Sequence, residues 1–222
     1  MSLNKIARAV AVMSVLVFAS CGGGTTEPSG SGSSAQSCRT YATASTTTGA
    51  GARTLTCTFN SNNQLACTMT LSACGTVSFS VNYASRGDFV DEVSVIPPRM
   101  LQTSQTTAAN ACGITNATYA YDGQKRLLNY TINGLTYSYS AWDTGGRPTT
   151  GIITGPSAPV GESWSYTDAS RSATLVQSVP GGSTTTTYVY DANGNPASVT
   201  VISGLSVGTS ITTTTGTAQV CR

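Results

Sequence analysis

The sequence predicts an all-β protein built from stacked antiparallel β-hairpins that disulfides staple together. Apolar residues alternate with Ser and Thr, as in residues 76–83 and 197–202. A period of two residues is typical of strands with one buried face. Turn-forming pairs such as Asn133-Gly134 and Asn193-Gly194 separate these runs, as they do in hairpins. The chain has 222 residues, which is enough for one domain or two small ones.

The first residues have the pattern of an export signal. Lys5 and Arg8 precede an apolar run at residues 9–18, and small residues lead into Cys21. The run is too short to span a bilayer, which needs about 20 apolar residues. The pattern resembles the lipobox of bacterial lipoproteins. The resemblance implies a lipoprotein signal peptide over residues 1–20, cleavage before Cys21, and diacylglycerol and palmitate on Cys21. The alternative is an ordinary secretory signal that leaves Cys21 as a free thiol.

Residues 21–37 are rich in Gly and Ser and predict a flexible tether. Three acyl chains exceed what stable membrane anchoring requires, so the expected partner is a membrane, reached through the lipid. Gly22 follows the cysteine, which in the lipoprotein resemblance implies the outer membrane. We therefore expect an outer-membrane lipoprotein of the cell envelope, either periplasmic or exposed at the cell surface.

Six cysteines follow the tether, and an even number in an exported chain indicates disulfides. Six cysteines allow fifteen connectivities, and the sequence does not choose among all of them. Cys57 and Cys67 flank an Asn-rich turn and would face each other if Asn63 adopts a left-handed bulge. Cys38 and Cys221 lie at the two ends of the folded part, so a bond between them would close it. The remaining candidate pair is Cys74–Cys112.

The folded part divides into an N-terminal β region at residues 38–112, with most of the cysteines, and a C-terminal β region at 113–222. Pro97-Pro98 interrupts the pattern, so the sequence leaves open one sheet or two. Among the threonine runs, we expect residues 46–48 to form a loop, and residues 184–187 and 212–215 to form strands.

A short motif recurs in the C-terminal region. In each copy, an aromatic residue near the end of a predicted strand is followed by an aspartate that opens a turn. An Arg or Asn often follows the turn. The turn aspartates are Asp122, Asp143, Asp168 and Asp191, and a fainter copy spans residues 59–65. Asp and Asn open turns by accepting hydrogen bonds from backbone amides. A Gly or Asn three residues later suits the left-handed position of a bulged hairpin, and the Arg can lie over a ring. Each unit is therefore predicted to be a hairpin that buries its face against the next.

This motif resembles the YD repeat of the Rhs family, and the match covers roughly residues 115–200. In large members of that family, many repeats spiral into a hollow β-shell that encloses a cargo. Four or five units are too few for such a shell, and the family's self-cleavage segment and toxin domain have no counterpart here. The resemblance thus implies a β-hairpin meander and an envelope setting.

The amino-acid composition excludes several classes of functional site. The chain has no His, and charged residues are 9% of it against roughly 25% in an average domain. This excludes His-dependent triads and His-rich zinc sites, and the formal charge of +2 argues against a nucleic-acid partner. The spacing of the cysteines lacks the pairs typical of zinc sites. We expect no metal and no cofactor other than the lipid.

The carboxylate group Asp88, Asp91 and Glu92 is interpreted as a solvated turn before a strand at residues 93–96. Alternatives are a glycosidase-like acid pair and a calcium loop. Residues 86–88 spell an adhesion tripeptide of the kind that arises by chance. Lys125 is expected to be solvated, the alternative being a base for a serine nucleophile.

The sequence predicts a non-enzymatic lipoprotein that presents its β domain for binding or structural assembly, with a glycan or protein partner at the envelope. A glycan would stack on exposed aromatic rings, although core packing is the other use for these rings. The candidate binding aromatics are Tyr119, Tyr137, Tyr139, Trp142, Trp164 and Tyr188. The alternatives are an envelope hydrolase that uses its carboxylates, and an accessory subunit of an Rhs-type or secretion system.

Overall fold

The computed structural model describes residues 37–222 apart from 180 and 205. Within that range, fourteen antiparallel strands form one closed barrel in which the first strand pairs with the last. The all-β, antiparallel, disulfide-linked fold predicted from the sequence is confirmed. The signal peptide, Cys21 and all of the tether except Ser37 lie outside the described residues.

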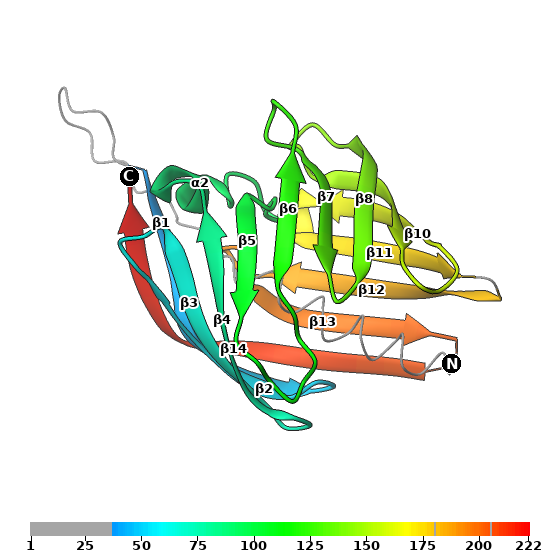
Figure 1. Ribbon diagram of the computed structural model, residues 1–222, viewed down its shortest axis with the longest axis horizontal. Helices are drawn as coiled ribbons and strands as arrows, with labels where there is room; N and C mark the ends of the chain where they lie inside the picture. Colours follow the sequence, from blue (N-terminus) through cyan, green and yellow to red (C-terminus); the bar gives the residue numbers. More distant parts are fainter. Residues whose placement is uncertain (1–36, 180, 205) are drawn as a thin grey trace.

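The strands follow one another up and down, and each pairs with its neighbours in the chain. In the N-terminal region they are β1 (Cys38–Gly49), β2 (Arg53–Phe59), β3 (Gln64–Leu71), β4 (Gly75–Tyr83) and β5 (Gln102–Thr107). In the C-terminal region they are β6 (Ala117–Tyr121), β7 (Leu127–Ile132), β8 (Leu135–Trp142), β9 (Pro148–Thr154), β10 (Val160–Thr167), β11 (Ser172–Val179), β12 (Gly182–Tyr190), β13 (Pro196–Ser203) and β14 (Ser206–Cys221). Figure 1 shows β1 and β14, from opposite ends of the chain, side by side.

One sheet contains both β regions. β5 pairs with β6 through Ser104–Thr118 and Gln105–Ala117, so Pro97-Pro98 interrupts the chain without dividing the sheet. The prediction of strands at 184–187 and 212–215 is confirmed. The prediction of a loop at 46–48 is wrong, because these threonines lie within β1 and pair with β14, and Thr46 and Thr47 also pair with β2. Their β-branched side chains suit a strand.

The connection from β4 to β5 holds a short helix, α2 (Arg86–Asp91). Ser85 caps it: its Oγ accepts the amide of Asp88 at 3.0 Å and donates to the Asp88 carboxylate at 2.8 Å. Ser85 is thus the N-cap of the helix. The expected solvated turn is therefore a capped helix, and residues 93–96 form turns and bends instead of the expected strand.

The helix closes one end of the barrel with an aromatic side chain. Phe89 is fully buried and stacks on Phe59 with ring centroids 4.1 Å apart. The guanidinium of Arg39 lies 3.9 Å from the centre of the Phe89 ring and donates to the Phe89 carbonyl. Inward-facing residues of β2, β3 and β4 continue this core, among them Leu65, Cys67, Met69, Val77, Phe79 and Val81.

Three disulfides join Cys38 to Cys221, Cys57 to Cys67 and Cys74 to Cys112. These are the three candidate pairs from the sequence. The first two link directly opposed residues of neighbouring strands, and the first of them lies where β1 and β14 close the barrel. The third ties the turn after β3 to the loop after β5.

Candidate functional site

The recurring motif forms the same turn at four places along one end of the barrel. Each turn begins with an Asp or Asn, has a residue with positive φ three positions later, and ends on a polar residue one position after that. The first residues are Asn60, Asp122, Asp143 and Asp191, the positive-φ residues are Asn63, Lys125, Gly146 and Gly194, and the last residues are Gln64, Arg126, Arg147 and Asn195.

The hydrogen bonds of these four turns are equivalent. The amide of the first residue donates to the carbonyl of the last over 2.8–3.1 Å. The side-chain Oδ1 of the first residue accepts the amide of the last over 2.8–3.2 Å. The predicted role of Asp122, Asp143 and Asp191 as turn formers is thereby observed, and the faint copy at residues 59–65 has the same geometry. Lys125 takes the positive-φ position that glycine holds in the turns of Asp143 and Asp191.

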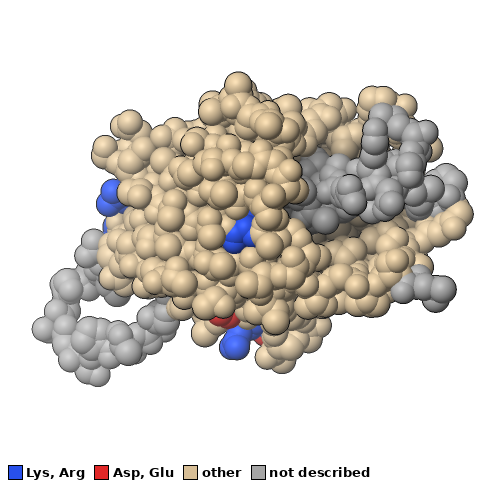
Figure 2. Space-filling view, turned by 90° about the horizontal axis from the view of Figure 1, so that it is seen from below, with Lys and Arg blue, Asp and Glu red and all other residues tan. Residues whose placement is uncertain are grey.

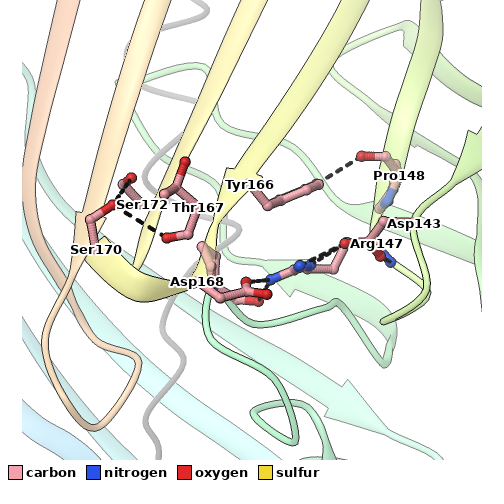
Figure 3. Close-up of polar contacts among 9 residues, drawn as sticks. Asp143, Arg147, Pro148, Tyr166, Thr167, Asp168, Ser170 and Ser172 are labelled. Atoms are coloured by element: carbon pink, nitrogen blue, oxygen red, sulfur yellow. Dashed lines mark hydrogen bonds and ion pairs between the residues drawn. The ribbon is translucent and has the colours of Figure 1, made fainter.

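Neighbouring turns interlock through their arginines and aromatic rings. Arg126 lies over the ring of Trp142 at 4.6 Å, and Arg147 lies over the ring of Tyr166 at 4.3 Å. Trp142 donates to the carbonyl of Leu127, and Tyr166 donates to the carbonyl of Pro148 (Figure 3). Each ring therefore packs on the arginine of the preceding hairpin and also donates to the backbone next to it.

Asp168 departs from the repeat. It opens the 3-10 turn η1 (Asp168–Ser170), which ends at Arg171 with φ of 49°. Its carboxylate turns to the preceding hairpin, where Oδ1 pairs with Nη1 of Arg147 at 2.7 Å. Figure 3 shows Arg147 between Asp143 and Asp168. Asp168 is thus a turn former through its backbone and a link between hairpins through its side chain.

We call the end of the barrel that carries these turns and α2 the charged end. Asp88 pairs with Lys125 at 2.6 Å, and Asp91 pairs with Arg222 at 2.5 Å. Burial alone would raise the pKa of Asp88, but hydrogen bonds from Lys125 and Ser85 hold that pKa below its usual range. Lys125 remains more than half exposed, as expected.

The expectation that the whole carboxylate group is solvated is wrong for two of its members. Asp88 is 8% exposed and Glu92 is 1% exposed. Burial raises the pKa of Glu92, an effect that Arg39 and the amide of Leu101 partly offset. Folding of α2 onto the barrel end buries the two side chains, which a local reading of residues 88–92 does not reveal.

The six candidate binding aromatics do not form an exposed platform, and their burial matches the other use considered for them, core packing. Tyr137 and Tyr188 are buried, and the other four are half-buried. Tyr137 stacks on Tyr130 with centroids 4.3 Å apart, and Trp164 stacks on Tyr188 at 5.8 Å. Five of the six rings belong to the core clusters of the C-terminal region, and the sixth, Trp142, lies under Arg126.

A carboxylate lies among these rings. Glu162 is 4% exposed and accepts a hydrogen bond from Gln177 at 2.9 Å. Burial raises the pKa of Glu162 to about 7, although Gln177 and Tyr139 stabilise its charged form. Glu162 was not among the residues predicted from the sequence to have a role. The alternation along β10 places Glu162 on the same face as Trp164 and Tyr166, and that pattern could have identified it as interior.

The outer wall of the barrel, meaning the outward-facing side chains of the strands, is uncharged. The fourteen strands hold three charged residues, Arg39, Arg53 and Glu162. Arg39 and Glu162 are buried, and Arg53 shares the inward face of β2 with Leu55 and Cys57. Burial lowers the pKa of Arg53 to about 10. Figure 2 shows a face on which charged side chains appear at only a few places.

Hydroxyl groups replace charges on this wall and form rows across the strands. One row of directly paired, exposed threonines crosses β14, β1, β2, β3 and β4. Its members are Thr213, Thr46, Thr54, Thr70 and Thr76. A second row crosses β10 to β14. Its members are Ser165, Thr174, Thr187, Thr200 and Thr209.

The wall is hollowed over β2 to β5. The hollow has a volume of about 530 Å³. Its outward-facing lining is Thr56, Thr58, Ala66, Thr68, Ser78, Ser80, Thr106 and Ala108. Ala66 stands in the middle of a cross-strand row whose other members carry hydroxyls, and its short side chain helps to leave the space open.

No protein-family model matches the chain, and no curated protein matches its sequence. In the part of the chain that the structure describes, no three His, Cys, Asp or Glu side chains come together in a way that could hold a metal ion. Over the same residues, no helix is both long enough and apolar enough to cross a membrane.

Proposed function

We propose that this protein is a non-enzymatic lipoprotein of the cell envelope, held to a membrane by lipid on Cys21, that presents its barrel for binding or structural assembly at the outer membrane or cell surface. The observation that carries this proposal is the separation of charge in the fold. Charged side chains gather at one end and in the interior, while the outer wall offers hydroxyls to its surroundings.

The same geometry suggests an orientation. β1 begins at Cys38 beside Cys221, and the adjacent Arg222 pairs with Asp91 of α2. The tether therefore joins the barrel at the charged end. In the proposed arrangement this end faces the membrane, and the wall and the opposite end face outward. The polar turns of the charged end suit a hydrated headgroup region, and ion pairs satisfy many of their charges internally.

The four equivalent turns support, as part of this proposal, the resemblance to YD repeats of the Rhs family. An accessory role beside a larger Rhs or secretion protein is compatible with that resemblance. Docking by strand addition needs a free sheet edge, and every described strand is paired on both sides. Such a partner would have to bind a wall or an end of the barrel.

The hydrolase alternative rests on Asp88, Asp91 and Glu92. Two of these carboxylates form ion pairs with Lys125 and Arg222, and the third is buried. These contacts give all three residues a role in holding α2 to the barrel. If Asp88→Asn and Asp91→Asn each lower a hydrolytic activity of the envelope fraction without lowering the amount of folded protein, the alternative replaces our proposal.

Protease shaving of intact cells tests the location. We expect the wild-type chain to carry label from an alkyne-bearing palmitate analogue and to fractionate with the outer membrane. The Cys21→Ala variant should lose both properties, whereas Ser34→Ala, also in the tether, should keep them. Cleavage in intact cells would place the barrel at the surface, and protection until the outer membrane is opened would place it in the periplasm. An unlabelled wild-type chain that leaves the membrane fraction would refute the proposal.

A further inference from the structure

The hollow over β2 to β5 is a concave feature of the hydroxyl wall. Two cross-strand rows line it. The first runs Thr56–Thr68–Ser78 and the second runs Thr58–Ala66–Ser80–Thr106. Neighbouring strands are roughly 4.8 Å apart, and alternate residues of a strand are roughly 6.7 Å apart. The rows therefore present hydroxyls on a regular two-dimensional grid around the short side chain of Ala66.

These hydroxyls are available to a ligand. Thr56 donates to the carbonyl of Thr68 at 3.4 Å, a long contact. Within the described residues, the side-chain hydroxyls of Thr58, Thr68, Ser80 and Thr106 have no hydrogen-bond partner. A hydroxyl both donates and accepts, so each can serve either kind of group on a ligand.

From this grid we infer that the hollow binds a neutral polysaccharide chain. This inference rests on the proposed function and deepens it by naming the class of ligand. No residue that lines the hollow is charged, so an acidic or basic polymer would find no counter-charge there. A ligand rich in hydroxyls matches groups that both donate and accept, and the methyl groups of the threonines offer small apolar contacts to the faces of sugar rings.

Other classes of partner fit less well. An extended peptide gains its affinity from main-chain hydrogen bonds at a sheet edge, and the strands under the hollow are paired on both sides. A protein interface usually has a central aromatic or Arg anchor in a pocket, and the only ring among the lining residues, Phe79, points into the core.

Hydrogen bonds between neutral groups contribute only about 0.5–1.5 kcal/mol each, so we expect one hollow to bind a polysaccharide weakly. Many tethered copies on one polymer would bind more strongly.

Affinity electrophoresis of the detergent-solubilised full-length lipoprotein tests the inference. The gels contain dextran, unsubstituted β-1,3-glucan or mannan as neutral polymers, and alginate or chitosan as charged ones. We expect at least one neutral polymer to retard the protein and neither charged polymer to do so. Ala66→Ile fills the hollow and should weaken retardation at least tenfold. Thr68→Val removes one hydroxyl at nearly constant shape and should weaken it about threefold.

Matched controls lie on the outward face of β6, outside the hollow. Ala120→Ile and Thr118→Val make the same chemical changes on an exposed strand, and neither should alter retardation by more than the error of the measurement. All variants should keep three disulfides and the wild-type circular dichroism. If Ala66→Ile loses either property, the nearly isosteric Thr68→Val decides the test. The inference is wrong if no neutral polymer retards the wild type, if a charged polymer retards it more, or if the control variants lose as much as the hollow variants. Any of these results leaves the lipid anchor and the envelope location, tested by shaving, unaffected.

Discussion

Arg147 and Asp168, which belong to turns of neighbouring hairpins, form an ion pair with 2.7 Å between Nη1 and Oδ1. The side chain of Arg147 is nearly buried, whereas that of Asp168 is 70% exposed. Arg147 also pairs with Asp143 of its own turn and donates to the carbonyl of Pro97. One guanidinium thus connects two hairpins and the segment that follows α2.

Replacement of Arg147 should therefore lower the free energy of unfolding more than replacement of its exposed partner Asp168 does. Arg147→Met leaves Asp143 and the Pro97 carbonyl without this donor, and we expect a loss of about 2 kcal/mol of unfolding free energy. Asp168→Asn removes a mostly solvated pair and should cost less than about 1 kcal/mol. Urea unfolding followed by tryptophan fluorescence measures both values. Equal losses in the two variants would show that the buried contacts of Arg147 contribute little.

Glu162 should make stability depend on pH. Its pKa is raised to about 7 by burial, so the folded state holds the proton more tightly than the unfolded state. The resulting stabilisation is fully present below the unfolded pKa of about 4.3 and is lost as pH rises through about 7. Because the side chain is almost fully buried, the difference could reach about 3 kcal/mol.

Comparison of wild type with Glu162→Gln isolates this contribution from that of the other carboxylates. We expect the unfolding free energy of the wild type to fall relative to that of the variant between pH 5 and pH 8. The two curves should differ most in slope midway between the unfolded pKa of about 4.3 and the folded pKa of about 7, where the two states differ most in bound protons. Parallel curves would mean that Glu162 ionises in the fold as readily as it does in the unfolded chain.

The left-handed residue of the β2–β3 turn allows a test of backbone conformation. Asn63 has a φ of 57°, a region that Asn tolerates and that a Cβ otherwise disfavours by roughly 1–2 kcal/mol. Asn63→Ala should destabilise the protein by about 1 kcal/mol, and Asn63→Gly should be neutral or slightly stabilising. Thermal unfolding of the three proteins checks the order. A less stable glycine variant would point to a role for the Asn63 side chain.

The disulfides should contribute unequally to the free energy of unfolding. Cys38–Cys221 spans 183 residues and Cys57–Cys67 spans 10. Both link directly opposed strand residues. In the chain-entropy description, the first contributes about 5 kcal/mol and the second about 3 kcal/mol. The paired variants Cys38→Ser/Cys221→Ser and Cys57→Ser/Cys67→Ser can be compared by urea unfolding. If the second pair of substitutions costs more, local packing around the buried Cys57–Cys67 bond outweighs loop entropy.

Much of the fold was predictable because it depends on local sequence. Alternation sets the faces of a strand, and Asp or Asn followed by a left-handed residue sets a hairpin turn, so the all-β class and the turns of Asp122, Asp143 and Asp191 follow from residues close together in the chain. The candidate pair Cys57–Cys67 also came from one hairpin. The pair Cys38–Cys221 was predicted because these cysteines lie at the two ends of the folded part. Cys74 and Cys112 were the two cysteines left for the third pair.

Tertiary structure decided the features that depend on distant residues. Closure of the barrel requires β1 to meet β14, and no local pattern encodes that register. Closure turned most of the aromatic rings inward and left many Thr and Ser side chains on the outer wall, where their hydroxyls meet the solvent. Packing of α2 against Arg39 and β4 buried Asp88 and Glu92, which by themselves resemble solvated turn residues. The sequence by itself determined the strands and their turns, whereas the pairing of remote strands determined which face of each strand meets the solvent.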